Sequence, residues 1–297
     1  MDNQDKEEWY LAFVVGELEE GKAEPTQKIN AIEVICHDTL EQDRRAISEY
    51  HNSLQLVNSV QLNIQQFLEA VVHYAANFLE TRDMNEEKFD SISLNFSRLL
   101  LNIFSMFRSL LDHSNHSLSR KFGRNSGQFG RWKKVQSEQY DNLFEYRLFY
   151  KLRNYCQHVG MPPIQISFTD SIEQEGIGFR LDILRDKLLE EKGVWNQQLI
   201  ADLRTSQEKI SVIDSLHNWG EAFRTISSTL LDIKRNIALE SAKRIVSYRE
   251  RHNLPKGVGR LCAIQFSKSE KKAEHLNFTM EWLPEQKAQD LIMGTPH

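Results

Sequence analysis

The sequence predicts a mainly α-helical protein, an antiparallel helical bundle that carries small β-hairpin appendages. Three long stretches repeat apolar residues at three- and four-residue spacing, which is the period of a helix with one buried face. Only 13 glycines and 6 prolines occur in 297 residues, too few for a turn-dense all-β protein. We therefore expect a single domain over residues 1–297, with the bundle core at about 40–256.

The first long pattern places nine apolar residues of ten on one helical stripe, made of Ile47, Tyr50, Leu54, Val57, Gln61, Ile64, Leu68, Val71, Ala75 and Phe78. The second helix, at about 85–118, is apolar around most of its circumference, so we expect it to be central and buried. It keeps a polar stripe from Asn95 to His116, and buried polar groups need partners or water.

The third long pattern runs from Ile213 toward Tyr248 and stops before Pro255. A shorter helix is expected at about 137–158, where Gly160 and the two prolines after it end the pattern. Four helices with apolar stripes and modest connections are typical of an antiparallel bundle.

Apolar and polar residues alternate at period two in two further regions, which predicts β-hairpins at about 164–184 and 260–283. The apolar run from Trp9 to Val15 is expected to add a further strand.

The remaining composition excludes several classes of protein. The first residues are acidic and polar, so no secretory signal is expected, and the early apolar run is too short to span a bilayer. Cys36, Cys156 and Cys262 lie far apart without a CxxC pair, unlike a disulfide framework or a zinc site. Phosphate-loop, dinucleotide-binding, HExxH and GxSxG motifs do not occur. We expect a cytoplasmic protein without cofactor, metal or membrane contact.

The segment Arg153–His158 groups polar chemistry at the end of the short helix. Residues four apart share a face, so Arg153 pairs with Gln157 and Asn154 with His158, whereas Arg153 and His158 differ by about 140°. We expect the glycine–proline stop to loosen the last turn and bring His158 toward Arg153. A histidine can exchange protons with RNA oxygens, and an arginine can hold the phosphate. A twofold dimer would supply a second histidine.

This pattern resembles the R-x(4–6)-H motif of the HEPN superfamily. Arg153 and His158 match its two fixed positions, and Asn154 matches the polar residue that usually follows the arginine. The resemblance implies a compact helical bundle, often dimeric, and in many members a metal-independent ribonuclease of antiviral defence or a toxin. The motif covers six residues only, and the helical stretch at about 47–251 is compatible with such a bundle.

The segment Arg120–Lys134 is basic in a chain whose net charge is −5. Basic side chains can bind the phosphates of single-stranded RNA, and aromatic rings can stack on its bases. The segment also contains three glycines, so we expect it to be a mobile connector. The alternative is a solvated loop whose aromatic residues pack on the bundle. The candidate RNA-binding residues are Arg120, Lys121, Arg124, Arg131, Trp132, Lys133 and Lys134.

Asp112 and His116 lie four residues apart, a spacing that allows a carboxylate to orient an imidazole. With Gln157 they are candidates to support the Arg153/His158 site, although they can also form a plain polar helix end. Additional ligands at useful spacing are missing, so a metal site is not expected.

Two classes of function fit these residues. The first is a HEPN-like, metal-independent endoribonuclease that acts as a homodimer, as a defence effector or a toxin. The alternative is a non-catalytic binding or sensor module with a protein partner such as an antitoxin, and nucleotide binding without turnover is a third possibility. In a purely structural interpretation, Arg153 and His158 only meet the negative end of the helix dipole.

Overall fold

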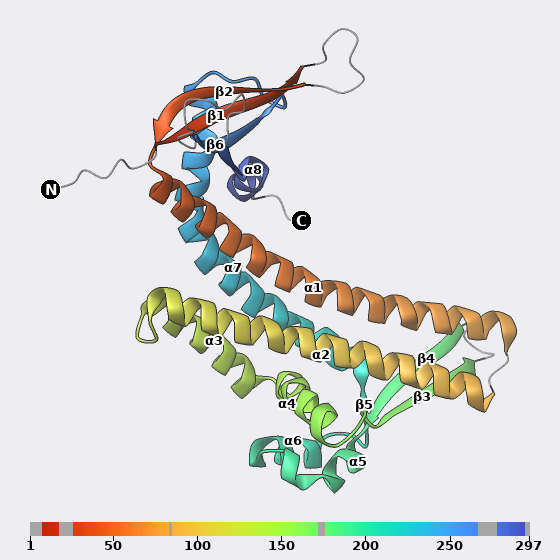
Figure 1. Cartoon of the computed structure of the whole chain (residues 1–297). Helices are drawn as coiled ribbons and strands as arrows, with labels where there is room; N and C mark the ends of the chain where they lie inside the picture. Colours follow the sequence, from red (N-terminus) through yellow and green to blue (C-terminus); the bar gives the residue numbers. More distant parts are fainter. Residues whose placement is uncertain (1–7, 18–25, 83–84, 172–175, 267–277, 295–297) are drawn as a thin grey trace. The chain divides into compact units, whose positions relative to one another are not determined.

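The computed structural model of the chain describes residues 8–17, 26–82, 85–171, 176–266 and 278–294 (Figure 1). These residues are mainly helical with two small antiparallel sheets, which confirms the predicted fold class at this level. The chain forms two compact units, one of residues 1–52 with 232–297 and one of residues 53–231. This division does not test whether the two units unfold together, so the single domain over residues 1–297 stays a prediction. In the described part, every helix is too short or too polar to cross a membrane.

The first unit contains a four-stranded antiparallel sheet in the order β2-β1-β6-β7. The strands are β1 (Trp9–Glu17), β2 (Thr26–Ile35), β6 (Arg260–Phe266) and β7 (Phe278–Trp282). The predicted strand at Trp9–Val15 and the C-terminal hairpin are confirmed. The sequence did not predict β2, because a register shift between Leu11 and Ala12 interrupts the alternation of its side chains.

One face of this sheet holds the core of the first unit. Leu11 and Phe13 of β1 pack there with Leu261 and Ala263 of β6. Helix α8 (Glu285–Met293) covers this face together with the first turns of α1 (His37–Thr81) and the last turns of α7 (Val212–Arg251).

Arg249 fixes the turn that leads from α7 into β6. Its guanidinium forms a two-pronged ion pair with Glu285, at 2.7 and 3.0 Å, and donates to the carbonyl oxygens of Val258 and Gly259 at 3.0 and 3.2 Å. Glu285 also accepts the backbone N–H of Leu261 at 3.0 Å. The buried charges are therefore paired, and the arginine supplies donors to carbonyls that follow the helix.

The second unit is built around α2 (Glu86–Phe122), as its apolar circumference predicted. Phe96 of α2 meets Phe67 of α1 at a ring distance of 5.4 Å. Phe107 of α2 packs on Trp219 of α7 at 4.9 Å. The polar stripe of α2 does not lie in the core, because its members are half-exposed or exposed. These side chains are therefore accessible to water, and Asn95 also donates to the Tyr74 hydroxyl and accepts from Arg98.

The predicted helix at about 137–158 is in fact two helices, α3 (Gly127–Asn142) and α4 (Phe144–His158). Leu143 between them has an extended backbone, with φ −121° and ψ 118°. A break without glycine or proline leaves no signal in the sequence. Phe149 of α4 packs against Phe104 of α2 at 5.0 Å and against Trp219 at 6.0 Å.

The predicted hairpin at about 164–184 is confirmed as β3 (Ile164–Ser171) and β4 (Gly176–Leu184), and β5 (Lys209–Ser211) pairs with β4. The sequence did not predict the short helices α5 (Arg185–Glu190) and α6 (Gln197–Thr205), nor the 3₁₀ turn Lys192–Val194.

Gly259 is constrained both by its backbone and by its neighbours. Its φ is +63°, and a Cβ atom there would lie 2.6 Å from the Phe13 ring and 2.7 Å from the carbonyl oxygen of Val14. Gly257 also has a positive φ, +74°, but the space around it is open.

We predict that Gly259→Ala destabilises the protein by well over the about 1–2 kcal/mol that a left-handed backbone alone costs. Gly257→Ala should show only that conformational cost and serves as the matched control. Urea unfolding followed by circular dichroism measures both. Equal losses for the two variants would contradict the close approach of Gly259 to β1.

Candidate functional site

His158 is the last residue of α4, and its side chain is exposed. The backbone N–H groups of Val159 and Gly160 both donate to the carbonyl oxygen of Tyr155, at 2.8 and 3.3 Å. The helix is therefore regular to its end, and the expectation that its last turn loosens is wrong. Within one chain, Arg153 and His158 keep their separation of about 140° around the helix.

Arg153 is half-buried and incompletely paired. Its Nη1 donates to Oδ1 of Asn154 at a long 3.5 Å, while its Nε is buried without a hydrogen-bonding partner. A buried unpaired donor costs about 1–3 kcal/mol, more for a charged group. Arg153 therefore keeps an N–H donor that no acceptor among the described residues satisfies. Gln157, one turn later on α4, is exposed.

The side chains between Arg153 and His158 hold this turn on the protein. The buried Tyr155 ring stacks on Trp195 at 5.5 Å and 9°, and the Trp195 indole donates to the carbonyl of Leu188 at 2.7 Å. Burial raises the pKa of the Cys156 thiol to about 11, so this thiol is protonated at neutral pH. A protonated thiol is a poor nucleophile and a poor metal ligand.

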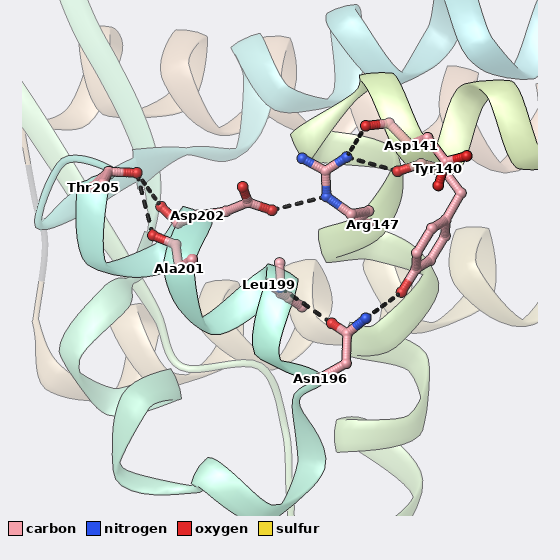
Figure 2. A network of polar contacts seen from close by, with 8 residues as sticks. All are labelled: Tyr140, Asp141, Arg147, Asn196, Leu199, Ala201, Asp202 and Thr205. Carbon is pink, nitrogen blue, oxygen red and sulfur yellow. Dashed lines mark hydrogen bonds and ion pairs between the residues drawn. The ribbon is translucent and has the colours of Figure 1, made fainter.

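Figure 2 shows the polar network that positions the start of α4. Arg147 is buried; its Nε donates to Asp202 of α6 at 2.8 Å, and its Nη1 donates to the carbonyls of Tyr140 and Asp141 at 2.6 and 2.9 Å. The Tyr140 hydroxyl accepts from Asn196 at 3.0 Å. Arg147 thus ties α4 to both the end of α3 and α6.

Asp112 contacts α4 indirectly. It accepts from Arg108 Nε at 2.8 Å, and Arg108 also donates to the hydroxyl of Tyr150 and lies 5.0 Å over its ring. Tyr150 is one turn before Arg153, so Asp112 supports the turn that precedes the candidate site. His116 is exposed and forms no part of this chain of contacts. Among the described residues, no three His, Cys, Asp or Glu side chains gather to hold a metal ion.

The basic segment is a tight helix–helix connection, so the expectation of a mobile connector is wrong. Helix α2 ends at Phe122, Gly123 has φ +83°, and Ser126 caps α3 by accepting the N–H of Phe129 at 3.2 Å. The six basic side chains are exposed on the last turn of α2, on this turn and on α3: Arg120, Lys121, Arg124, Arg131, Lys133 and Lys134.

Trp132 does not belong to the exposed basic surface. It is fully buried, and its indole N–H donates to Asn115 of α2 at 2.9 Å. Its face is therefore not available to a base, which corrects its place among the RNA-binding candidates. Phe122 and Phe129 are half-buried, as the alternative interpretation of packed aromatic residues predicts.

Two exposed apolar side chains, Val159 and Met161, follow His158 directly. Apolar side chains scattered singly on a surface are ordinary, so this pair by itself marks no binding surface. Sequence reasoning missed this pair, as well as Arg147, Arg108 and Tyr150, whose partners come from other elements.

The comparisons with known proteins give no relative: no family model, no curated protein and no solved structure matches the chain. Function must therefore be inferred from the residues of the site.

We predict that the two arginines of α4 differ sharply in structural importance. Arg147→Met leaves two carbonyls and a carboxylate without donors, so it should lower the free energy of unfolding by about 3 kcal/mol. Arg153→Met removes a buried donor that has no acceptor, so it should leave the free energy of unfolding unchanged or raise it by up to about 1–3 kcal/mol. Urea titrations of both variants compare these values, and similar large losses would mean that Arg153 is also a structural residue.

Proposed function

We propose that this chain is a HEPN-like, metal-independent endoribonuclease that works as a homodimer in the cytoplasm, as a defence effector or a toxin. The observation that carries the proposal is the Arg153 guanidinium, whose buried Nε has no acceptor, five residues before an exposed histidine. A phosphate oxygen is the kind of acceptor that such a guanidinium binds.

In the proposed reaction the 2′-oxygen attacks the neighbouring phosphorus and the bond from phosphorus to the 5′-oxygen breaks. His158 of one copy accepts the proton of the 2′-hydroxyl. A second histidine donates a proton to the leaving 5′-oxygen, and Arg153 stabilises the charge on the phosphate. Asn154 orients Arg153 through the contact between their side chains.

Two copies are required because each chain places one histidine at this end of α4 and holds it about 140° from Arg153. A twofold arrangement can bring the Arg153 of one copy toward the His158 of the other. The exposed Val159 and Met161 lie next to His158 in the chain and would be covered by such an arrangement.

The exposed basic side chains at the α2–α3 connection are the proposed RNA-positioning surface. Their concentration in an acidic chain would attract the phosphate backbone at long range. The proposal leaves out Trp132 and assigns Asp112 a supporting role through Arg108 and Tyr150.

The alternative is a non-catalytic binding or sensor module, for example with an antitoxin-like partner. The separation of Arg153 and His158 in one chain favours it, because acid–base and phosphate-binding groups must reach the same phosphate. Activity of the purified chain decides between the two.

We predict that the purified protein cleaves single-stranded RNA in excess EDTA and leaves 2′,3′-cyclic phosphate ends. Arg153→Ala and His158→Ala should each reduce the cleavage rate by about 10²-fold or more, the range for a positioned acid–base group or charge stabiliser. His113→Ala, which changes an exposed histidine of α2, is the control. The proposal fails if both site variants cleave like the parent, or if cleavage needs a divalent ion and leaves a 3′-hydroxyl.

We also predict that Arg124, Arg131, Lys133 and Lys134, all changed to Gln, weaken RNA binding and flatten its salt dependence. For single strands the slope of log K against log salt falls by about 0.7 for each phosphate that the protein no longer neutralises. Cleavage at saturating RNA should change much less, because these residues position the strand.

A matched variant changes four other exposed cations to Gln: Arg45, Lys243, Lys256 and Lys287. It alters the net charge by the same amount and should keep the parent slope. Fluorescence anisotropy at several salt concentrations measures both. Identical slopes in the two fourfold variants would exclude the α2–α3 connection as the RNA-binding surface.

A further inference from the structure

Arg108 of α2 reaches across to α4 at the turn before Arg153. Its Nε donates to Asp112 at 2.8 Å, its Nη1 donates to the hydroxyl of Tyr150, and its guanidinium lies 5.0 Å from the centre of the Tyr150 ring. On α4, Tyr150 and Arg153 are separated by about 4.5 Å along the axis and by about 60° around it. Arg108 is therefore held against the same side of α4 that carries Arg153.

The guanidinium of Arg108 keeps donors that the protein does not use. An arginine has five N–H donors, and Asp112 and Tyr150 accept from two of those of Arg108. No other acceptor for this side chain occurs among the described residues, and the side chain is 34% exposed. Three N–H donors are therefore left on a guanidinium that is partly open to solvent.

Arg147 shows what a structural arginine looks like in the same part of the fold. Its side chain is only 7% exposed, and its Nε and Nη1 donate to three acceptors on α3 and α6. Arg108 has neither this burial nor this number of acceptors. A structural role alone therefore leaves most of the donors of Arg108 unexplained.

The contact between α2 and α4 does not require Arg108. Phe104 of α2 packs on Phe149 of α4 with ring centres 5.0 Å apart, and Phe107 of α2 packs on Tyr146 with ring centres 5.8 Å apart. These buried rings join the two helices. The polar contacts of Arg108 fix the direction of its own guanidinium.

A guanidinium with a fixed direction is suited to binding phosphate. Asp112 and the Tyr150 ring restrict Arg108 before a ligand arrives, so less conformational entropy is lost when the ligand binds. The planar arginine fork matches the oxygen atoms of a phosphate group. Asp112 offsets part of the charge, so we expect the contact to add a modest amount of affinity.

Arg108 also lies on the helix that leads to the proposed RNA-positioning surface. Arg120, the first basic residue of that surface, is twelve residues farther along α2, about 18 Å at 1.5 Å per residue. A phosphate contact at Arg108 would extend this surface toward α4.

We infer that Arg108 binds a second phosphate of the RNA strand, next to the phosphate that Arg153 holds. The contact of Arg153 rests on the proposed function. Asp112 and Tyr150 act as positioning residues for Arg108. The preferred ligand is then a single strand of at least three nucleotides, because a dinucleotide has one phosphate and fills only one of the two contacts.

The test measures binding to 2′-O-methyl oligoribonucleotides of two, three and five nucleotides without terminal phosphates. They carry one, two and four phosphates and have no 2′-hydroxyl that could attack, so binding is measured without cleavage. Competition against a labelled pentanucleotide, followed by fluorescence anisotropy, gives the Kd of each. In the parent protein we expect the second phosphate to improve Kd by about tenfold, the effect of one hydrogen bond to a charged group.

Arg108→Met should remove the gain from the second phosphate and leave the Kd of the dinucleotide within about twofold of the parent. The dinucleotide is thus an internal control for the fold of the variant. Tyr150→Phe keeps the ring and its packing but removes the hydroxyl that orients Arg108, so it should remove part of the gain. Arg224→Met deletes an exposed arginine of α7 that pairs with Glu221, and should keep the full gain.

A nucleoside diphosphate would offer two phosphates in a different geometry, joined through one oxygen. Because the two arginines come from different helices, ADP should compete no better than AMP. A large preference for ADP would mean that the two arginines hold a diphosphate group and not successive phosphates of a strand.

Other results would also overturn the inference. They are a parent protein that gains nothing from the second phosphate or binds none of the oligonucleotides, a gain that survives Arg108→Met, and an equal loss of dinucleotide and trinucleotide binding in that variant. Cleavage of unmodified RNA is assayed separately. A parent protein that shows the Arg108-dependent gain but never cleaves RNA would sink the proposed activity alone, whereas cleavage without this gain would sink the second phosphate contact alone.

Discussion

Where α3 ends, the carbonyl groups of Tyr140 and Asp141 no longer have helical partners, and the guanidinium of Arg147 supplies their donors. The same side chain holds Asp202 of α6. The direction of α4 away from α3, and with it the place of Arg153 and His158, depends on this contact. Because a buried cation must satisfy several acceptors at once, small displacements of any of these elements are costly.

Much of the fold could be predicted from the spacing of apolar residues, because burial on one side imposes a period. The helical period located α1, α2 and α7, and the period of two residues located the two hairpins. Strand β2 was missed, since its alternation is interrupted by a register shift opposite Leu11 and Ala12. Helices α3 and α4 were merged, because Leu143 breaks the helix through its backbone conformation and not through glycine or proline.

The candidate site was predictable only in part. A sequence motif was enough to select Arg153, Asn154 and His158 as candidates. The directions of their side chains depend on α4, which stays a regular helix to its last residue. Trp132 was wrongly predicted to bind RNA. In a sequence, an aromatic residue among cations gives the same pattern whether its ring faces solvent or the core. The buried indole N–H of Trp132 donates to Asn115, which is 17 residues away in the chain. The structural importance of Arg147 depends on Asp202, 55 residues away, which no local pattern reveals.

Gly259 has a consequence for how this sequence changes over generations. A side chain at that position would meet the Phe13 ring and the carbonyl oxygen of Val14, and the backbone there is in the left-handed region. A replacement therefore loses stability unless β1 changes at the same time. Gly257 shares the left-handed backbone but has open space around it, so it should vary more freely than Gly259 among descendants of this sequence.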